Sequence, residues 1–242
     1  FLKVSMFAKK TIAVGVAVST IFLSGCDAIK DYSPDLAGVL GGGSSEGIDI
    51  DVGRSLETLD YVFINDTPRA PVFSREKQFG SAWTDDNTTE LGGNGCNTRD
   101  DVLGRDLDDT TFEDEDECVV STGTLKKDPY TGREIRYRKG TTTSRLVQVD
   151  HIVSLENAWD SGAWQWSQQE RVNYANDTSL LLAVDGPEAQ EKAGRAADQW
   201  LVPHNSDFQC AYAALQVDIK DTYGLSMTSD ERDVLKSVLE RC

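Results

Sequence analysis

The chain has 242 residues, and 39% of them are hydrophobic, which is enough for one sizeable core. Its formal net charge is −17. Contacts with phosphate are made by Lys and Arg, so this charge excludes a protein that binds nucleic acid over its whole surface and leaves only a local basic site.

The N-terminal segment is typical of an export signal. Lys9 and Lys10 precede a charge-free apolar stretch, residues 11–23, which is short for a membrane span and fits a secretory signal peptide. The residues Leu23-Ser24-Gly25-Cys26 resemble the lipobox of bacterial lipoproteins, which implies cleavage before Cys26 and lipidation of its thiol. An ordinary signal peptide with a chance cysteine is the alternative. We therefore expect a signal peptide over 1–25 and a lipoprotein on the outer face of the bacterial cytoplasmic membrane.

A flexible tether is predicted over residues 26–55, because this stretch contains the Gly- and Ser-rich sequence GVLGGGSSEG. The folded domain is predicted over residues 56–242, and no internal repeat interrupts it.

The first half of the domain mixes short helices and strands. A helix is predicted over 74–83, and Thr98 with Asp101 forms a capping-box-like start for a second one. An apolar run, a Pro-Gly turn and an alternating segment predict a β-hairpin over 118–139.

The stretch RLVQVDHIV, residues 145–153, predicts a further strand. Its alternation places Asp150 and His151 on opposite faces, so a site that uses both needs the strand to end or bulge there.

Helices dominate the second half. Ser167 with Glu170, and Thr228 with Glu231, form capping boxes that open two helices. The remaining predicted elements are a buried strand over 180–184, a helix from the Asp185-Gly186-Pro187 turn to about residue 199, and a helix over 207–223 with Gly224 as its C-cap.

The charge is unevenly distributed. Eight of the twelve residues in 106–117 are acidic, whereas 125–146 holds seven basic and two acidic residues. The basic segment leads into Asp150 and His151 and is the candidate strip for contacts with phosphate, although a charge run is usually only a solvated face. The candidate contacts are Arg99, Arg136, Arg138 and Arg145, with an ion pair to Asp100 or Asp101 as the alternative for Arg99.

Four cysteines remain when Cys26 is set aside, and an even set in an exported domain predicts disulfides. Four cysteines allow three pairings, and proximity in the sequence favours Cys96–Cys118 and Cys210–Cys242. A zinc site is the weaker alternative because no C-x-x-C spacing exists.

Asp150 and His151 are the candidate reactive pair. Two strands followed by a helix can hold one divalent metal between a strand end and the helix. Asp150 would supply an oxygen ligand and His151 would take a proton from water, while the metal stabilises charge on a phosphate.

The segment from Ser81 to Cys242 resembles a known family, with long matching stretches such as SAWTDDN, NGCNTRDDVLGRDL, VQVDHIVSLENAWDSGAWQWSQQER and ANDTSLLLAVDGP. The chain resembles the secreted HNH-type nuclease-like family (domain DUF1524), which is related to the C-terminal domain of GmrSD restriction endonucleases. The resemblance implies an α+β fold with a ββα-metal core of the HNH or His-Me finger type. It also implies metal-dependent cleavage of nucleic acid, DNA more than RNA, with His151 as general base, Asp150 as metal ligand and Mg²⁺ or Mn²⁺ as the ion.

The sequence departs from the family pattern at several positions, among them Ala193-Gly194, which stands where members have Gly-Asp. Leu180 replaces an Asn in the second strand, and Ala189 replaces the helix Asn that is the expected second metal ligand. A methyl group cannot coordinate a cation, so Asp185 or Glu188 would have to substitute. Lys192 is retained, either as a catalytic contact to phosphate or as an ordinary surface lysine.

Two functions are therefore open. One is an exported, lipid-anchored, metal-dependent endonuclease, and the other is a catalytically degraded nuclease-like lipoprotein that acts as a binding or structural module. Trp159, Trp164 and Trp166 could stack on bases, with core packing as the alternative. His204 is read as a surface residue, and no oligomeric state is predicted.

Overall fold

The structure is a computed structural model that describes residues 51–113, 115 and 117–242. The predicted signal peptide, Cys26 and nearly all of the tether lie outside these residues. Within the described part, no helix is long and apolar enough to cross a membrane.

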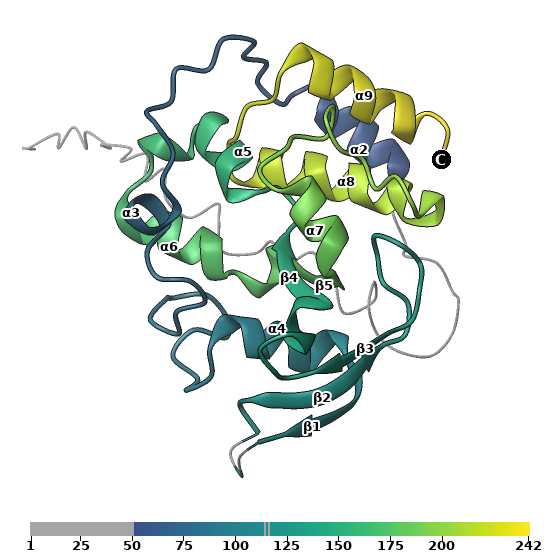
Figure 1. Cartoon of the computed structure of the whole chain (residues 1–242). Helices are drawn as coiled ribbons and strands as arrows, with labels where there is room; N and C mark the ends of the chain where they lie inside the picture. The colour runs from purple at the N-terminus through teal and green to yellow at the C-terminus, as the bar shows by residue number, and fades with distance from the viewer. Residues whose placement is uncertain (1–50, 114, 116) are drawn as a thin grey trace, which may run out of the picture. The chain divides into compact units, whose positions relative to one another are not determined.

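The described chain forms a mixed α+β domain, as expected (Figure 1). Its helices are α2 (Val52–Leu59), α3 (Arg75–Phe79), α4 (Thr98–Asp106), α5 (Leu155–Asp160), α6 (Gln168–Asn176), α7 (Gly186–Lys192), α8 (Ser206–Thr222) and α9 (Ser229–Leu239). Its strands are β1 (Asp108–Phe112), β2 (Val120–Leu125), β3 (Ile135–Arg138), β4 (Val147–His151) and β5 (Leu181–Asp185). Short 3-10 turns, η1 (Thr143–Arg145), η2 (Ala163–Gln165) and η3 (Thr178–Leu180), connect some of them.

The strands form two antiparallel sheets, one with the order β1-β2-β3 and one made of β4 and β5. The predicted hairpin is β2 and β3. Strand β1 was not predicted, because it lies inside the acidic run and its pairing with β2, rather than its own composition, makes it a strand.

Several predicted boundaries can be compared with the helices. The boundary between tether and domain, at residue 56, falls inside α2, which packs against α8 and α9 (Figure 1). Helix α4 is capped by Asn97 rather than Thr98, since Asn97 is the extended residue whose side chain accepts a hydrogen bond from the Asp100 amide. Helix α7 ends at Lys192, well before residue 199, because Ala193 turns the chain with a φ of 48°.

Of the two predicted capping boxes, the one at α6 forms completely and the one at α9 forms only in part. Ser167 and Glu170 form both reciprocal bonds at α6. At α9 the Thr228 side chain accepts from the Glu231 amide, but the Glu231 carboxylate points inward to Lys220, at 2.8 Å. After α8, Gly224 has a φ of 60°, the left-handed conformation expected just past a helix end.

Strands β4 and β5 and helix α7 together form a ββα arrangement. The two strands pair in continuous register, and α7 begins directly after β5 and packs against both strands. Gly186 is needed at this junction: its amide donates to the Leu146 carbonyl at 3.0 Å, and a Cβ there would lie 1.8 Å from the Arg145 carbonyl oxygen. The close approach brings α7 onto the strand that carries Asp150 and His151.

Side chains bond the outer edge of β5. Arg105, at the end of α4, donates to the Leu181 carbonyl at 2.6 Å, and Asp106 accepts from the Ala183 amide at 2.7 Å. Asp128 accepts from the Asp185 amide at 2.8 Å. The backbone N–H and C=O groups of these alternate residues point away from β4. The side chains of Arg105, Asp106 and Asp128 therefore make the hydrogen bonds that a third strand would make.

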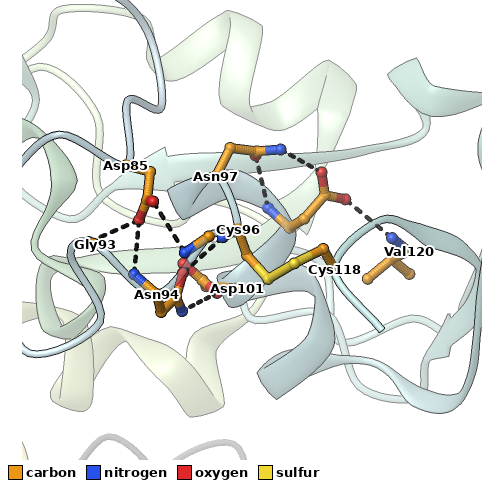
Figure 2. The surroundings of a disulfide bond; sticks show 10 residues. Asp85, Gly93, Asn94, Cys96, Asn97, Asp101, Cys118 and Val120 are labelled. Atoms are coloured by element: carbon orange, nitrogen blue, oxygen red, sulfur yellow. Dashed lines mark hydrogen bonds between the residues drawn. A yellow bond between two sulfur atoms is a disulfide. The ribbon is translucent and has the colours of Figure 1, made fainter. Parts of the chain in front are cut away.

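Both predicted disulfides are present, Cys96–Cys118 and Cys210–Cys242. Figure 2 shows the first: Cys96 precedes α4 and Cys118 precedes β2. Beside it, the Asp100 carboxylate accepts from the Val120 amide at 3.2 Å. The bond and this contact together attach α4 to the three-stranded sheet.

Candidate functional site

His151 ends β4 and is buried, with 6% of its surface exposed. Its Nε2 lies 3.0 Å from the Ala175 carbonyl oxygen, which can only accept, so Nε2 carries the hydrogen and Nδ1 holds the free lone pair. The ring lies nearly parallel to those of Trp83 and Tyr174, at centroid distances of 5.8 and 6.4 Å. The imidazole is thereby fixed in one tautomer and one orientation.

Burial lowers the pKa of His151 to about 4, against the opposing effects of the Asp150 charge and the Ala175 hydrogen bond. The ring is therefore neutral at neutral pH, and its Nδ1 is able to accept a proton.

The low pKa predicts an acid-sensitive fold. Between pH 6.5 and about 4, His151 is protonated in the unfolded chain but not in the folded chain. The free energy of unfolding therefore falls as the pH falls through this range. The expected loss is about 3 kcal/mol, measured by urea unfolding across this range. His151→Phe should remove this part of the pH dependence, and His204→Phe should retain it. Superimposable profiles for wild type and His151→Phe would contradict the assignment.

Asp150 faces the other side of β4. Its Oδ2 accepts from the Tyr130 hydroxyl and from Lys192 Nζ, each at 2.8 Å. Lys192 Nζ also donates to the His151 carbonyl at 2.6 Å. Because β4 keeps a regular register through its last residue, the two side chains point to opposite faces, as the alternation predicted.

Lys192 is fully buried, with 0% of its side chain exposed. It is therefore not a surface lysine, and its Nζ, bonded to Asp150 and to the His151 carbonyl, is occupied within the protein. Its position instead attaches the last turn of α7 to the end of β4. We interpret it as a residue that positions the strand end.

Asp185 is not brought to Asp150. In the sheet register Asp185 pairs with Val147, whereas Asp150 pairs with Leu182. The Asp185 carboxylate caps α7 by accepting from the Glu188 amide at 3.0 Å. Glu188 lies 3.5 Å from His204 Nε2, and His204 is exposed as expected.

The donor set at the strand end does not fit the metal site that the resemblance implies. No group of three or more His, Cys, Asp or Glu residues within the described part of the chain could hold an ion. Ala189 packs against the main hydrophobic core, and Leu180 is buried in it. Asp150 already has two donors on one oxygen. Mg²⁺ or Mn²⁺ therefore stays a prediction, and no chemical step is assigned to it.

The predicted arginines divide between two environments. Arg136 and Arg138 are exposed on one face of β3, and Arg145 is exposed in η1. Arg99 instead lies over the Tyr137 ring, 5.7 Å from its centroid, and does not pair with Asp100 or Asp101 in any ion pair of the described residues.

The acidic run lies beside the basic segment. Lys126 pairs with Asp108 at 3.2 Å, and Lys139 pairs with Glu113. These pairs offset part of the positive charge, so the strip available to phosphate is smaller than the composition indicated.

Two tryptophans are core residues. Trp159 is buried and donates to the Pro71 carbonyl at 2.7 Å, and Trp166 packs on Tyr174 and Tyr223. Trp164 alone of the three is substantially exposed, at 40%.

Sequence reasoning missed the residues that hold Asp150 and His151 in place. Tyr130 belongs to a stretch interpreted only as a turn, and Trp83 to one interpreted as a helix end. Trp83 has a φ of 58°, an unusual conformation for a bulky side chain, and stacks on His151. No local pattern marks either contact, since both join segments far apart in the sequence.

Residues 97–238 match the family model of the GmrSD restriction endonucleases, C-terminal domain. A protein of Arthroderma benhamiae described as an uncharacterized secreted protein is 36% identical over 149 residues, covering 61% of this chain and 68% of the relative. No solved structure matches the chain. The matched region contains α4, His151 and α7. It also contains one cysteine of each disulfide, Cys118 and Cys210. The chain therefore belongs to the family of the GmrSD restriction endonuclease C-terminal domain.

Proposed function

We propose that this domain hydrolyses phosphodiester bonds of nucleic acid, with His151 as the general base. The observation that carries the proposal is the fixed neutral imidazole, whose Nε2–H is bound to the Ala175 carbonyl and whose Nδ1 is the free acceptor. A base needs this combination of orientation and an available lone pair. Membership of a nuclease-like family supports the same reaction.

In the proposed step, Nδ1 of His151 removes a proton from water while the water oxygen forms a bond to phosphorus. The scissile P–O bond breaks, and the leaving oxygen takes a proton from solvent. The protonated ring then returns its proton to solvent. Because the pKa is about 4, deprotonation of the ring limits the rate only in acid, and the rate should fall as the pH drops towards that value.

Asp150, Lys192 and Tyr130 have a positioning role in this proposal. The Lys192 ammonium bonds both the Asp150 carboxylate and the His151 carbonyl, and thereby holds the backbone from which the imidazole extends. Lys192→Met should lower the cleavage rate and retain an acid limb in the pH profile, because the base is still present. That limb should move to higher pH, since the Lys192 charge is one of the effects that lower the pKa of His151.

Nicking of supercoiled plasmid tests the proposal, with parallel reactions in Mg²⁺, in Mn²⁺ and in EDTA. His151→Ala should lower the rate by about 10²–10⁴-fold, the usual contribution of a positioned base. The matched control is His204→Ala, which removes the chain's other histidine from an exposed position. Equal rates for wild type and His151→Ala, with both proteins folded, would reject His151 as the base. Activity lost in EDTA and restored by metal would support the predicted cofactor.

A second function, a nuclease-like binding module, is favoured by the enclosure of His151. The ring is 6% exposed and stacked on Trp83, and Ala189 offers no metal ligand. Binding of plasmid without nicking, under every metal condition, would support this alternative. Trp83→Gly is an informative variant, because glycine tolerates the backbone angle while the covering ring is removed. Nicking that appears only in this variant would show that access, not chemistry, is missing.

We also propose that the protein is exported and anchored through a lipid on Cys26. The secreted description of the relative supports export, and Leu23-Ser24-Gly25-Cys26 supports the anchor. Cys26→Ser should move the protein from the membrane fraction to the soluble exported fraction, or block its processing. Unchanged membrane association, followed by fractionation and immunoblotting, would argue against the lipid.

A further inference from the structure

A cavity of about 190 Å³ lies away from His151, between α5, α9, the loop that follows α7 and the segment around residue 65. Cavities of similar size hold benzene-sized molecules when they are apolar. This one is polar. Its lining includes Asn157, Asp160, Ser161, Asp198, Ser226 and Glu231.

Two residues of its lining each carry a buried side-chain oxygen that lacks a hydrogen-bond partner within the described residues. These oxygens are Asn157 Oδ1 and Glu231 Oε1. Glu231 is 1% exposed, so solvent does not readily satisfy its free oxygen. A buried acceptor without a partner costs about 1–3 kcal/mol, and more when it is charged. Both atoms are acceptors, so the missing partner must be a hydrogen-bond donor.

Three residues that line the cavity already bind one ammonium group, that of Lys220, which does not itself line the cavity. Lys220 Nζ, fully buried, donates to Ser161 Oγ at 3.2 Å, to the Ser226 carbonyl at 3.0 Å and to Glu231 Oε2 at 2.8 Å. All three partners also line the cavity. Lys220 occupies one oxygen of Glu231 and leaves the other free.

The charge of the lining favours a cation. Lys220 offsets the charge of Glu231, but Asp160 and Asp198 are exposed carboxylates, and no Lys, Arg or His lines the cavity. The described residues offer no set of three metal-binding side chains here or elsewhere. An ammonium group has three donors and no acceptor, which matches a lining of unpartnered acceptors.

We propose that this cavity binds a small organic cation through a primary ammonium group. Both free oxygens are closed to solvent in the unliganded chain, so the ammonium contacts Asn157 Oδ1 and Glu231 Oε1 once these two side chains turn towards the cavity. The exposed carboxylates of Asp160 and Asp198 contribute longer-range attraction. The site shares no residue with the His151 constellation, so it does not depend on the proposed nuclease activity.

Titration calorimetry of the full chain with n-butylammonium tests the proposal, with n-butanol as the neutral probe of the same chain length. We expect saturable binding of the amine, no comparable binding of the alcohol, and weaker binding at higher salt. Asn157→Leu should weaken binding about tenfold, because it removes a buried acceptor of a charged donor and no hydrogen bond that its side chain already makes. Asp198→Asn should weaken binding up to about fivefold, as for a solvent-exposed charge pair.

The matched control is Asp207→Asn, which makes the same change of charge at an exposed residue outside the cavity. Its affinity for the amine should equal that of the wild type. Failure of the wild-type chain to bind n-butylammonium saturably would overturn the proposal and leave the cavity as a site for water. Equal affinity for n-butanol, or equal weakening by Asp207→Asn and Asp198→Asn, would also overturn it.

Discussion

Replacing Glu231 with alanine should lower the free energy of unfolding by about 3–5 kcal/mol. The substitution leaves the buried Lys220 ammonium without a charged hydrogen-bond partner among the described residues, because its two other contacts, Ser161 Oγ and the Ser226 carbonyl, are neutral. Burial already lowers the pKa of Lys220 and Glu231 raises it, so the variant's lysine loses its proton more easily. The deficit should therefore shrink as the pH rises towards the pKa of an unfolded lysine, as measured by urea unfolding at several pH values.

Two controls separate the buried charge from simple loss of packing. Asp230→Ala removes a neighbouring exposed carboxylate of α9 and should change stability by less than about 0.5 kcal/mol. The double variant Lys220→Met/Glu231→Leu replaces the pair with apolar side chains and should recover most of the stability lost in Glu231→Ala. A double variant as unstable as Glu231→Ala would contradict this account.

Removal of the Cys210–Cys242 disulfide should cost about 3–4 kcal/mol, because it releases a loop with a sequence separation of 32 in the unfolded chain. The bond joins Cys210, in the second turn of α8, to Cys242, which lies beyond the end of α9. The paired variant Cys210→Ser/Cys242→Ser avoids a leftover thiol, and its chemical unfolding should be compared with that of the wild type. The reduced wild-type protein should show at least this loss, since its Cys96–Cys118 bond is opened as well. A stability equal to that of the oxidised wild type would show that the unfolded chain gains little freedom.

Local signals predicted the elements that are local in origin. The β2–β3 hairpin has its turn residues between two β-rich runs, and the Ser167 and Glu170 capping box lies within four residues. In both cases the interaction that makes the structure lies close to the pattern that predicts it. The two disulfides span 22 and 32 residues, and their pairing was predicted instead from the order of the cysteines along the chain.

Long-range interactions decided the features that the sequence did not predict. Lys192 is buried because Asp150 lies 42 residues earlier and faces its Nζ. Tyr130 contacts the same carboxylate from 20 residues away. Strand β1 depends on its pairing with β2. The motif identified Asp150 and His151, but only the fold shows that their side chains have separate sets of partners.

The side chains along β5 have a consequence for self-association. A two-stranded sheet normally leaves an edge on which another chain can template a strand, the route to fibrils and domain-swapped dimers. Here Arg105, Asp106 and Asp128 occupy that edge, so it is closed without a further strand. Ala183 is fully buried and α4 packs against β5, so the edge opens to another chain only when α4 leaves it. Edge-to-edge polymerisation of this domain therefore requires at least local unfolding of α4.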